Sequence, residues 1–286
     1  MDKILITGAN GQLGNEFRQL APQHPEIEFI FTDVAELDIC NARAVSDFLS
    51  LHKPSFLVNC AAYTAVDKAE TDRDAAFRLN SDAVKNLNDG CLQHNVRLIH
   101  VSTDYVFDGK SYIPYNETDA TRPASVYGES KLAGERRLSS FNSIIIRTSW
   151  LYSSFGNNFV KTMMRIGAER ELVRVVFDQV GTPTYAADLA DAILQIFLHS
   201  KANVFTPGIF HYSNEGVTSW YDFARQVMLL SGRTCRVEPI ETKEYPTPTA
   251  RPPYSVLNKE KIKQTFGIHI PHWQDSLEKC IALLQN

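Results

Sequence analysis

The chain contains three groups of residues whose types and order suit the transfer of a hydride to a carbonyl. The first is residues 8–14, GANGQLG, with a glycine at every third position. The second is Ser102 followed by Thr103, and the third is Tyr127 with Lys131 four residues later. A glycine turn that opens a helix can bind a pyrophosphate, whereas a hydroxyl, a phenol and an ammonium can deliver a proton. Together they predict a nicotinamide-dependent oxidoreductase.

The glycine segment follows an apolar run and precedes a helical pattern that carries Leu13 and Phe17. In that setting Gly8 permits the tight turn, Gly11 lets backbone N–H groups approach a phosphate, and Gly14 lets the helix pack on the strand. The alternative is an ordinary strand-to-helix turn without a ligand. The strand before and the helix after favour a dinucleotide site.

Asp33 ends the second predicted strand, and no arginine follows it closely. It stands roughly twenty residues after the glycine segment, where a carboxylate accepts hydrogen bonds from an adenosine ribose. The same carboxylate would repel a 2′-phosphate. Asp33 is therefore expected to contact the ribose, with a turn or helix cap as the alternative.

A helix that starts at residues 123–125 places Tyr127 and Lys131 on one face. An ammonium beside a phenol stabilises the phenolate and lowers the pKa of the phenol toward neutrality, where proton donation is efficient. Lys131 can also bond a ribose hydroxyl, and Thr103, at a strand end, can orient the substrate carbonyl. The alternatives are a packing role for Tyr127 and a capping role for Thr103.

The composition argues against several other classes of protein. The 286 residues carry a formal net charge of −4, so the chain offers no basic surface for nucleic acid or anionic lipid. Neither a secretion signal nor an apolar run of membrane-spanning length is visible. The five cysteines are scattered and the eight histidines lack metal-ligand spacing, which predicts neither disulfides nor a metal site. A cytoplasmic protein with a small-molecule partner is expected.

Short apolar runs rich in β-branched residues alternate with helical stretches in the first half of the chain. The predicted strands are residues 3–7, 28–32, 55–60, 96–102 and 143–148. Such alternation predicts an α/β fold, a Rossmann-type doubly wound parallel sheet. After about Trp150 the pattern loosens, and a proline-rich loop follows at residues 247–253.

The change in pattern also predicts a division into domains. A dinucleotide-binding domain is expected at residues 1–150, with a return segment at 182–210. A smaller C-terminal substrate-binding domain is expected at residues 151–181 and 211–286.

At the level of whole motifs the chain resembles the extended short-chain dehydrogenase/reductases. The resemblance covers almost the entire chain and is carried by residues 7–14, 58–70, 102–109, 126–135, 147–150, 156–159 and 250–252. The glycine spacing, with two residues between successive glycines, is typical of the same lineage. Members of this family use NADPH, NADH or both.

The resemblance implies roles for individual residues. Catalysis would fall to Thr103, Tyr127 and Lys131. The cofactor would be bound by Gly8, Gly11, Gln12, Leu13, Gly14, Asp33, Asp38, Ile39, Ala62, Tyr63, Thr64, Tyr127 and Lys131. A sugar nucleotide would be bound by Thr103, Asp104, Trp150 and Arg251.

The activity that the resemblance implies is reduction of the C4 carbonyl of dTDP-4-dehydro-6-deoxy-L-mannose to dTDP-L-rhamnose, in nucleotide-sugar and cell-surface polysaccharide biosynthesis. Dehydratases of the family usually carry an Asp-Glu pair after the threonine, whereas Asp104 is followed by Tyr105. The alternatives are a non-catalytic NAD(P)-binding regulatory subunit, or another nucleotide-sugar reductase or epimerase.

Some relatives hold Mg²⁺ with glutamates at a dimer contact. Glu16 matches one such position, but Ala187 stands where the second glutamate is expected. This departure argues against a metal-held dimer, and the chain is expected to be a monomer or a homodimer.

Overall fold

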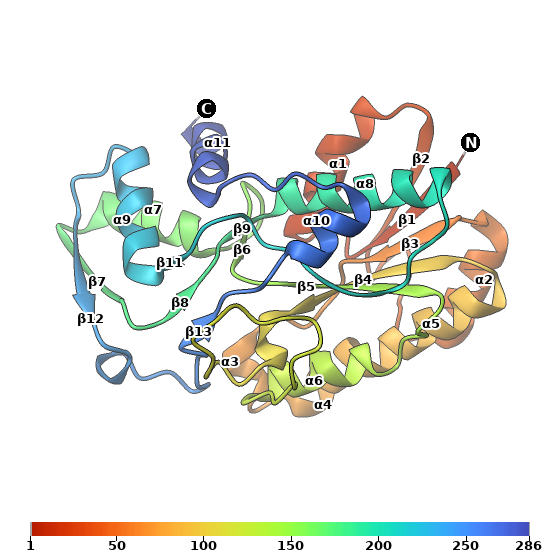
Figure 1. Cartoon of the computed structure of the whole chain (residues 1–286), viewed down its shortest axis with the longest axis horizontal. Helices are drawn as coiled ribbons and strands as arrows, with labels where there is room; N and C mark the ends of the chain where they lie inside the picture. The colour runs from red at the N-terminus through yellow and green to blue at the C-terminus, as the bar shows by residue number, and fades with distance from the viewer. Residues whose placement is uncertain (1, 286) are drawn as a thin grey trace.

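The computed structural model describes residues 2–285, which form two connected parts (Figure 1). The larger part is a parallel sheet of six strands in the order β10-β5-β4-β3-β1-β2. Its strands are β1 (Asp2–Thr7), β2 (Ile27–Thr32), β3 (Phe56–Asn59), β4 (Arg97–Thr103), β5 (Ser143–Thr148) and β10 (Gly208–His211). The predicted fold class and the five predicted strands are confirmed, because no predicted strand end differs by more than one residue.

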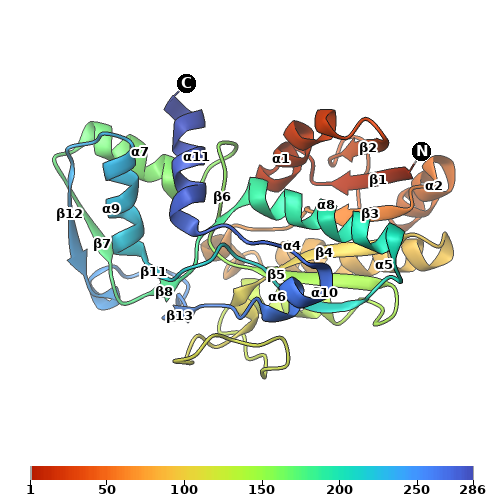
Figure 2. The same cartoon turned by 45° about the horizontal axis from the view of Figure 1, so that its top comes forward.

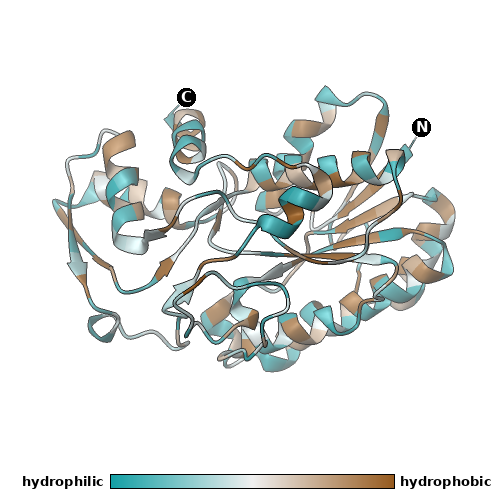
Figure 3. Ribbon diagram, viewed as in Figure 1, coloured by the Kyte–Doolittle hydropathy of each residue, from teal (hydrophilic) through white to brown (hydrophobic). Residues whose placement is uncertain are grey.

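The sheet is buried on both faces. Ile4 and Ile6 of β1 point into one core, and Leu5 between them points into the other. The first core is covered by α1 (Gln12–Leu20), α8 (Ala186–Ala202) and α10 (Glu260–Phe266). The second is covered by α2 (Ala42–His52) and α5 (Ala83–Gln93), and α6 (Val126–Glu135) lies in the same layer. Burial on both faces explains why the strands are coloured as mainly hydrophobic in Figure 3.

The smaller part lies at one end of the sheet and has its own apolar core (Figure 2). In it, β7 (Leu172–Val176) pairs in parallel with β12 (Arg236–Ile240). The helices of this core are α7 (Phe159–Glu169), α9 (Trp220–Leu230) and α11 (Trp273–Gln285). The short strands around it are β6 (Leu151–Tyr152), β8 (Val180–Gly181), β9 (Thr184–Tyr185), β11 (Thr218–Ser219) and β13 (Tyr254–Ser255).

The remaining elements are single helical turns. They are η1 (Ala21–Gln23), α3 (Val66–Ala69), α4 (Arg73–Phe77), the π-helical η2 (Arg78–Asp82), η3 (Asp104–Val106) and η4 (Thr242–Glu244). Within residues 2–285, every helix is too short or too polar to cross a membrane.

The chain crosses between the two parts more often than the sequence predicts. The helix α8 returns to the sheet, where it packs beside α1. The segment that contains α10 also returns, because Ile262 and Phe266 pack into the first core beside Phe210. Residues 262–270 therefore lie with the sheet, whereas the predicted partition places all of 211–286 in the second domain. The apolar face of α10 is only two side chains long, too short a pattern to assign from sequence.

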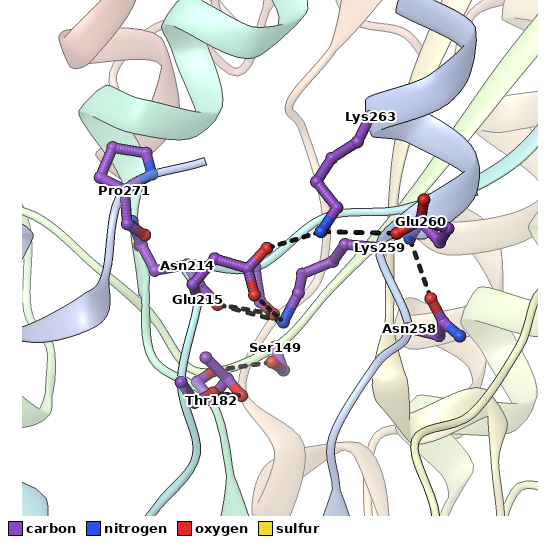
Figure 4. A network of polar contacts seen from close by, with 11 residues as sticks. Ser149, Thr182, Asn214, Glu215, Asn258, Lys259, Glu260, Lys263 and Pro271 are labelled. Atoms are coloured by element: carbon purple, nitrogen blue, oxygen red, sulfur yellow. Dashed lines mark hydrogen bonds and ion pairs between the residues drawn. The ribbon is translucent and has the colours of Figure 1, made fainter. Parts of the chain in front are cut away.

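A polar network ties the two parts together where the chain crosses between them (Figure 4). The buried Lys259 Nζ donates to Asn214 O at 3.3 Å and lies 3.4 Å from Glu215 Oε2. Lys263 Nζ donates to Glu215 Oε1 at 3.1 Å. Burial lowers the pKa of Lys259, and the Glu215 carboxylate opposes that shift. The pair compensates a charge that would otherwise be buried alone at the junction.

Candidate active site

A cleft of about 550 Å³ opens at the carboxyl ends of β1 and β3. The chain runs from β1 to β2 on one side and then to β3 on the other, and ligands of doubly wound sheets bind at such a reversal. The predicted cofactor residues that line it are Gly8, Gly11, Asp33, Asp38, Ile39, Ala62 and Tyr63. The lining residues that were not predicted to bind the cofactor are Thr7, Val34, Leu37, Cys40, Cys60, Ala61, Ala75, Arg78 and Leu79.

Six predicted cofactor residues lie outside this lining, and two of them, Tyr127 and Lys131, are described below with the catalytic residues. Leu13 and Gly14 are buried in α1 against the sheet. Gln12 Oε1 accepts a hydrogen bond from Asn158 Nδ2 at 2.9 Å and so faces the smaller part. Thr64 is exposed on the loop after β3. Their roles toward a cofactor stay predictions.

The three glycines meet different demands. Gly8 has a φ of +65°, and a Cβ there would lie 2.6 Å from Ala61 N. A Cβ on Gly14 would lie 2.5 Å from Ala9 Cα, so the close contact of helix and strand excludes any side chain. Gly11 caps the start of α1 in an extended conformation, and its Cβ would meet only Gly8 O at 3.2 Å. The turn therefore requires glycine at position 8 and the packing requires it at position 14, while Gly11 faces the cleft.

The structure shows Asp33 in the turn-capping role that was the alternative to a ribose contact. Its Oδ2 accepts from Asn10 N at 3.0 Å and its Oδ1 from Val34 N at 2.8 Å, so it holds the turn after β2. The residue also lines the cleft and is only partly buried. Its carboxylate is therefore fixed in place at the rim of the site.

Asn80, which the sequence analysis did not single out, holds the loop that carries Tyr63. Its Oδ1 accepts from Tyr63 N at 2.8 Å, and its Nδ2 donates to Tyr63 O at 3.0 Å and to Ser130 Oγ at 2.9 Å. A Cβ on Gly134 would lie 2.1 Å from Asn80 O, so α6 packs directly on η2. An asparagine among small and apolar residues of a helix was the available signal.

Thr103, Asp104 and Tyr127 meet beside the cleft. The predicted helix is confirmed as α6, and Ser125 Oγ caps it by accepting from Gly128 N at 3.1 Å. Thr103 Oγ1 donates to Asp104 Oδ1 at 3.0 Å. Burial raises the pKa of the Tyr127 phenol, and a hydrogen bond with Thr103 opposes the rise.

Lys131 is turned toward β4. Its Nζ donates to Val101 O at 2.7 Å and lies 3.4 Å from His100 Nε2. Burial lowers the pKa of Lys131 to about 8, while Glu135 opposes this shift. The expected lowering of the Tyr127 pKa toward neutrality is wrong for this structure, because the desolvation of the phenol outweighs any effect of the ammonium.

A buried ion pair stands behind the catalytic face of α6. Arg147 donates from Nε and Nη2 to the two oxygens of Glu135, at 3.0 and 2.7 Å. Ser102 Oγ donates to the same carboxylate at 2.5 Å, and the guanidinium lies 5.1 Å from the centre of the Phe107 ring. Two features of the sequence could have predicted this pair: an arginine inside an apolar strand, and a glutamate four residues after Lys131.

The predicted sugar-nucleotide residues come from separate segments. Asp104 is 4% exposed, its Oδ2 has no hydrogen-bond partner among residues 2–285, and burial raises its pKa to about 6. Arg251 Nη2 lies 2.6 Å from Asp67 Oδ2, which fastens the proline-rich loop to α3. Arg251 also lies close enough to the Tyr105 phenol to oppose the rise that burial causes in its pKa, and the Tyr105 ring packs edge-on against Tyr127 with ring centres 5.4 Å apart.

Trp150 lies where the chain leaves the sheet. Its φ of +47° is uncommon for a residue other than glycine. The indole stacks on Trp220 with ring centres 3.6 Å apart, and a Cβ on Gly181 would lie 2.7 Å from it. The sequence did not single out Trp220, because the two tryptophans are far apart in the chain.

Acidic residues do not gather into a metal site in the part of the chain that the structure describes. Glu16, the residue matched to a metal ligand of relatives, is 5% exposed and accepts from Ser153 Oγ at 2.6 Å. Burial raises the pKa of its carboxyl. A buried, hydrogen-bonded carboxyl is a poor ligand for a metal at a surface contact.

Comparison with known proteins gives a consistent result. The family model described as RmlD substrate binding domain matches residues 1–286. A dTDP-4-dehydrorhamnose reductase from Aggregatibacter actinomycetemcomitans is 41% identical over 291 residues, covering 99% of this chain and 99% of the relative.

Solved structures agree with this. A dTDP-4-dehydrorhamnose reductase from Clostridium acetobutylicum superimposes with a TM-score of 0.94 at 43% identity, covering 99% of this chain and 100% of the other. One from Bacillus anthracis, in complex with NADP, gives 0.92 at 36% identity, with 99% of each chain covered.

Proposed function

The chain belongs to the family of the RmlD substrate binding domain, and on that premise we propose that it is a dTDP-4-dehydrorhamnose reductase. It reduces the C4 carbonyl of dTDP-4-dehydro-6-deoxy-L-mannose to give dTDP-L-rhamnose. The observation that carries the proposal is the meeting of Thr103 and the buried Tyr127 phenol beside a cleft at the end of the sheet. The relatives named for this reaction support the substrate.

The cleft fits a nicotinamide dinucleotide. Gly11 leaves the N-terminus of α1 open, where backbone N–H groups bind pyrophosphate. Asp33 would hold the ribose at the rim, and the loop at residues 62–64 would cover the remaining length. NADPH or NADH, when bound, supplies the hydride that the protein itself cannot provide.

The catalytic roles follow from the chemistry of the side chains. Tyr127 holds its proton at neutral pH, because burial raises the pKa of the phenol, and so can donate it to the carbonyl oxygen. Thr103, whose hydroxyl is near enough to oppose the rise in the pKa of the phenol, would orient that oxygen. Lys131 would support the phenol from the next turn of α6 and would bind the cofactor ribose.

The substrate half of the site offers a buried acceptor and a cation. Asp104 Oδ2 lacks a partner within the described residues, and sugar hydroxyl groups are donors. Arg251 is the cation on the loop above it and suits the diphosphate of a nucleotide sugar. Trp150 forms the wall between the two parts of the chain.

Two other functions fit less well. A non-catalytic regulatory subunit would not need Thr103, Tyr127 and Lys131 to be intact and close to the cleft. A dehydratase needs a second acid and base beside the threonine, and here Tyr105 follows Asp104. An epimerase keeps its cofactor and regenerates it, so a net reductase is distinguished by cofactor consumption.

The decisive assay mixes the protein with NADPH or NADH, the dTDP-4-keto sugar and the upstream epimerase, and follows nicotinamide absorbance. We expect one cofactor oxidised for each dTDP-L-rhamnose formed. Turnover of the sugar without net oxidation would overturn the proposal in favour of an epimerase. No turnover, together with a stoichiometric enzyme partner in a pull-down, would favour the regulatory subunit.

Light scattering of the same sample distinguishes a monomer from a homodimer, and a chelator control tests for Mg²⁺.

A further inference from the structure

A row of buried polar side chains crosses the sheet and ends at Lys131. Thr7 Oγ1, at the end of β1, donates to Asn59 Oδ1 at 2.7 Å. Asn59 Nδ2, at the end of β3, lies 3.0 Å from His100 Nδ1 in β4. His100 Nε2 in turn lies 3.4 Å from Lys131 Nζ. In a row of buried polar groups each hydrogen-bond donor needs an acceptor, so fixing one group as donor or acceptor fixes its neighbours as well.

The direction is set by the backbone next to Asn59. Ala61 N donates to Asn59 Oδ1 at 3.1 Å, so this atom must be the amide oxygen. The amide nitrogen then faces His100 and can only donate. His100 Nδ1 is therefore the acceptor, and the neutral ring carries its single proton on Nε2. The pKa of His100 is held well below its usual range by burial, which keeps the ring neutral.

The resulting Nε2–H points at the side chain of Lys131. An ammonium has three N–H groups and no lone pair, so it would meet the ring with donor against donor. A neutral amine has one lone pair, which can accept from Nε2–H while an N–H donates to Val101 O at 2.7 Å. The surroundings of Nζ therefore match the uncharged amine.

We propose that His100, locked by Asn59 with its proton on Nε2, is a positioning residue for Lys131 that favours the uncharged amine. This rests on the proposed function for the role of Lys131 in the reaction. A lysine whose pKa is lowered in this way gains and loses its proton near the pH at which the reaction runs. An ordinary lysine stays charged throughout that range.

Other charged and titratable groups act on the same amine. Glu135 on α6 and Cys60 after β3 favour the ammonium, and desolvation by burial opposes them and has the larger effect. Arg147 on β5 donates two hydrogen bonds to the Glu135 carboxylate, and this reduces the electrostatic stabilisation that Glu135 gives to the Lys131 ammonium. The titratable groups that act on Lys131 directly are therefore His100 on β4, Glu135 on α6 and Cys60 after β3, while Arg147 on β5 acts through Glu135.

The tautomer can be measured in the protein without cofactor or substrate. In protein labelled with ¹⁵N-histidine, two-bond ¹H–¹⁵N spectra identify which ring nitrogen carries the proton, and substitution of single histidines assigns the signals. We expect His100 to be neutral with Nε2–H between pH 6 and 9. His211 is the internal control: its Nδ1 faces Tyr115 O at 3.1 Å and must donate to it, so its proton lies on Nδ1, the opposite tautomer to that expected for His100. A proton on Nδ1 of His100, or a charged ring at pH 7, would overturn the inference.

The consequence for Lys131 is read from the pH profile of kcat/KM. In Asn59→Asp the carboxylate attracts the proton to His100 Nδ1 and leaves Nε2 as an acceptor for the ammonium. The fall of kcat/KM at high pH is then expected to move upward by about one pH unit. Thr7→Val is the control for the midpoint alone, because Thr7 also lines the cleft. It removes the hydrogen bond from the Thr7 hydroxyl to Asn59 without changing the tautomer, so the midpoint should stay in place whatever the value of kcat/KM.

If Asn59→Asp does not fold, His100→Asn gives the same test, because it retains a polar group next to Asn59 and removes the donor beside Lys131. A lower activity with an unchanged midpoint in these variants would indicate a merely structural role and overturn the inference. Failure of the proposed function is separate: it appears as absent cofactor oxidation, while the tautomer spectra still decide the state of His100.

Discussion

The two halves of the candidate active site are built in different ways. The cofactor half comes from consecutive strand ends and turns, such as Gly8 and Asp33, whose positions follow from short-range geometry. The substrate half joins segments that are distant in sequence: Arg251 reaches Asp67 across 184 residues, and Trp150 stacks on Trp220. The first half can form with the sheet alone, whereas the second exists only when both parts of the chain are packed together.

The largest expected effect comes from α6, which serves both halves. Tyr127→Phe removes the acid and keeps the ring that packs against Tyr105 at 5.4 Å. We expect kcat to fall by roughly 10²–10⁴, the usual contribution of a general acid, with a much smaller change in the affinity for NADPH. Steady-state kinetics and calorimetry test this, and turnover near that of the unmodified protein would remove Tyr127 from its role.

Asp104→Asn tests how much the buried Asp104 carboxylate of the substrate half lowers the free energy of unfolding. Because burial raises the pKa of Asp104 from 3.8 to about 6, its protonated form stabilises the fold below about pH 4, and this contribution is lost as the pH rises through 6. At pH 8 the variant should be more stable by on the order of 2–3 kcal/mol, with little difference at pH 4. Urea unfolding at both pH values measures it.

Asp108→Asn is the control for that experiment. The Asp108 pKa is lowered, chiefly by the hydrogen bond from Lys110 N, so its substitution should not stabilise the protein at pH 8. Equal stability of Asp104→Asn and the parent at pH 8 would show that burial of the ionised Asp104 carboxylate does not destabilise the protein.

Arg251→Gln should separate the two halves kinetically. The ion pair with Asp67 is partly exposed, so its own contribution to stability is about 1 kcal/mol or less. Loss of the cation should raise KM for the sugar nucleotide about tenfold, as for one charge-assisted hydrogen bond, and leave cofactor affinity unchanged. Asp67→Asn, which frees the loop but keeps the arginine, should have a smaller effect. An equal loss of cofactor affinity would contradict the separation.

Asp33→Ala is the corresponding test in the cofactor half. We expect NADH to bind about tenfold more weakly, because an acceptor for the ribose is removed, and NADPH to lose less, because a charge that repels the 2′-phosphate is removed as well. Asp33→Asn keeps an acceptor without the charge and should lie between them. Calorimetry with both cofactors decides, and an equal loss for both would exclude this role for Asp33.

Short-range signals explain what could be predicted from the sequence. Five of the six strands of the sheet, the glycine turn at residues 8–14 and the start of α6 at the Ser125 cap all depend on neighbours within a few residues. Apolar periodicity, the demands on φ and the capping hydrogen bond are properties of such short stretches. These features determined the fold class and the location of the cofactor half.

Partners and burial were decided only by the tertiary structure. Whether α10 packs on the sheet, or whether Asn59 sets the tautomer of His100, depends on segments that meet after the chain has folded. The pKa of Tyr127 is the clearest example: its sequence position next to Lys131 predicted a lowered value, and burial raises it instead. Desolvation is a property of the whole surrounding structure, so no local pattern of residues encodes it.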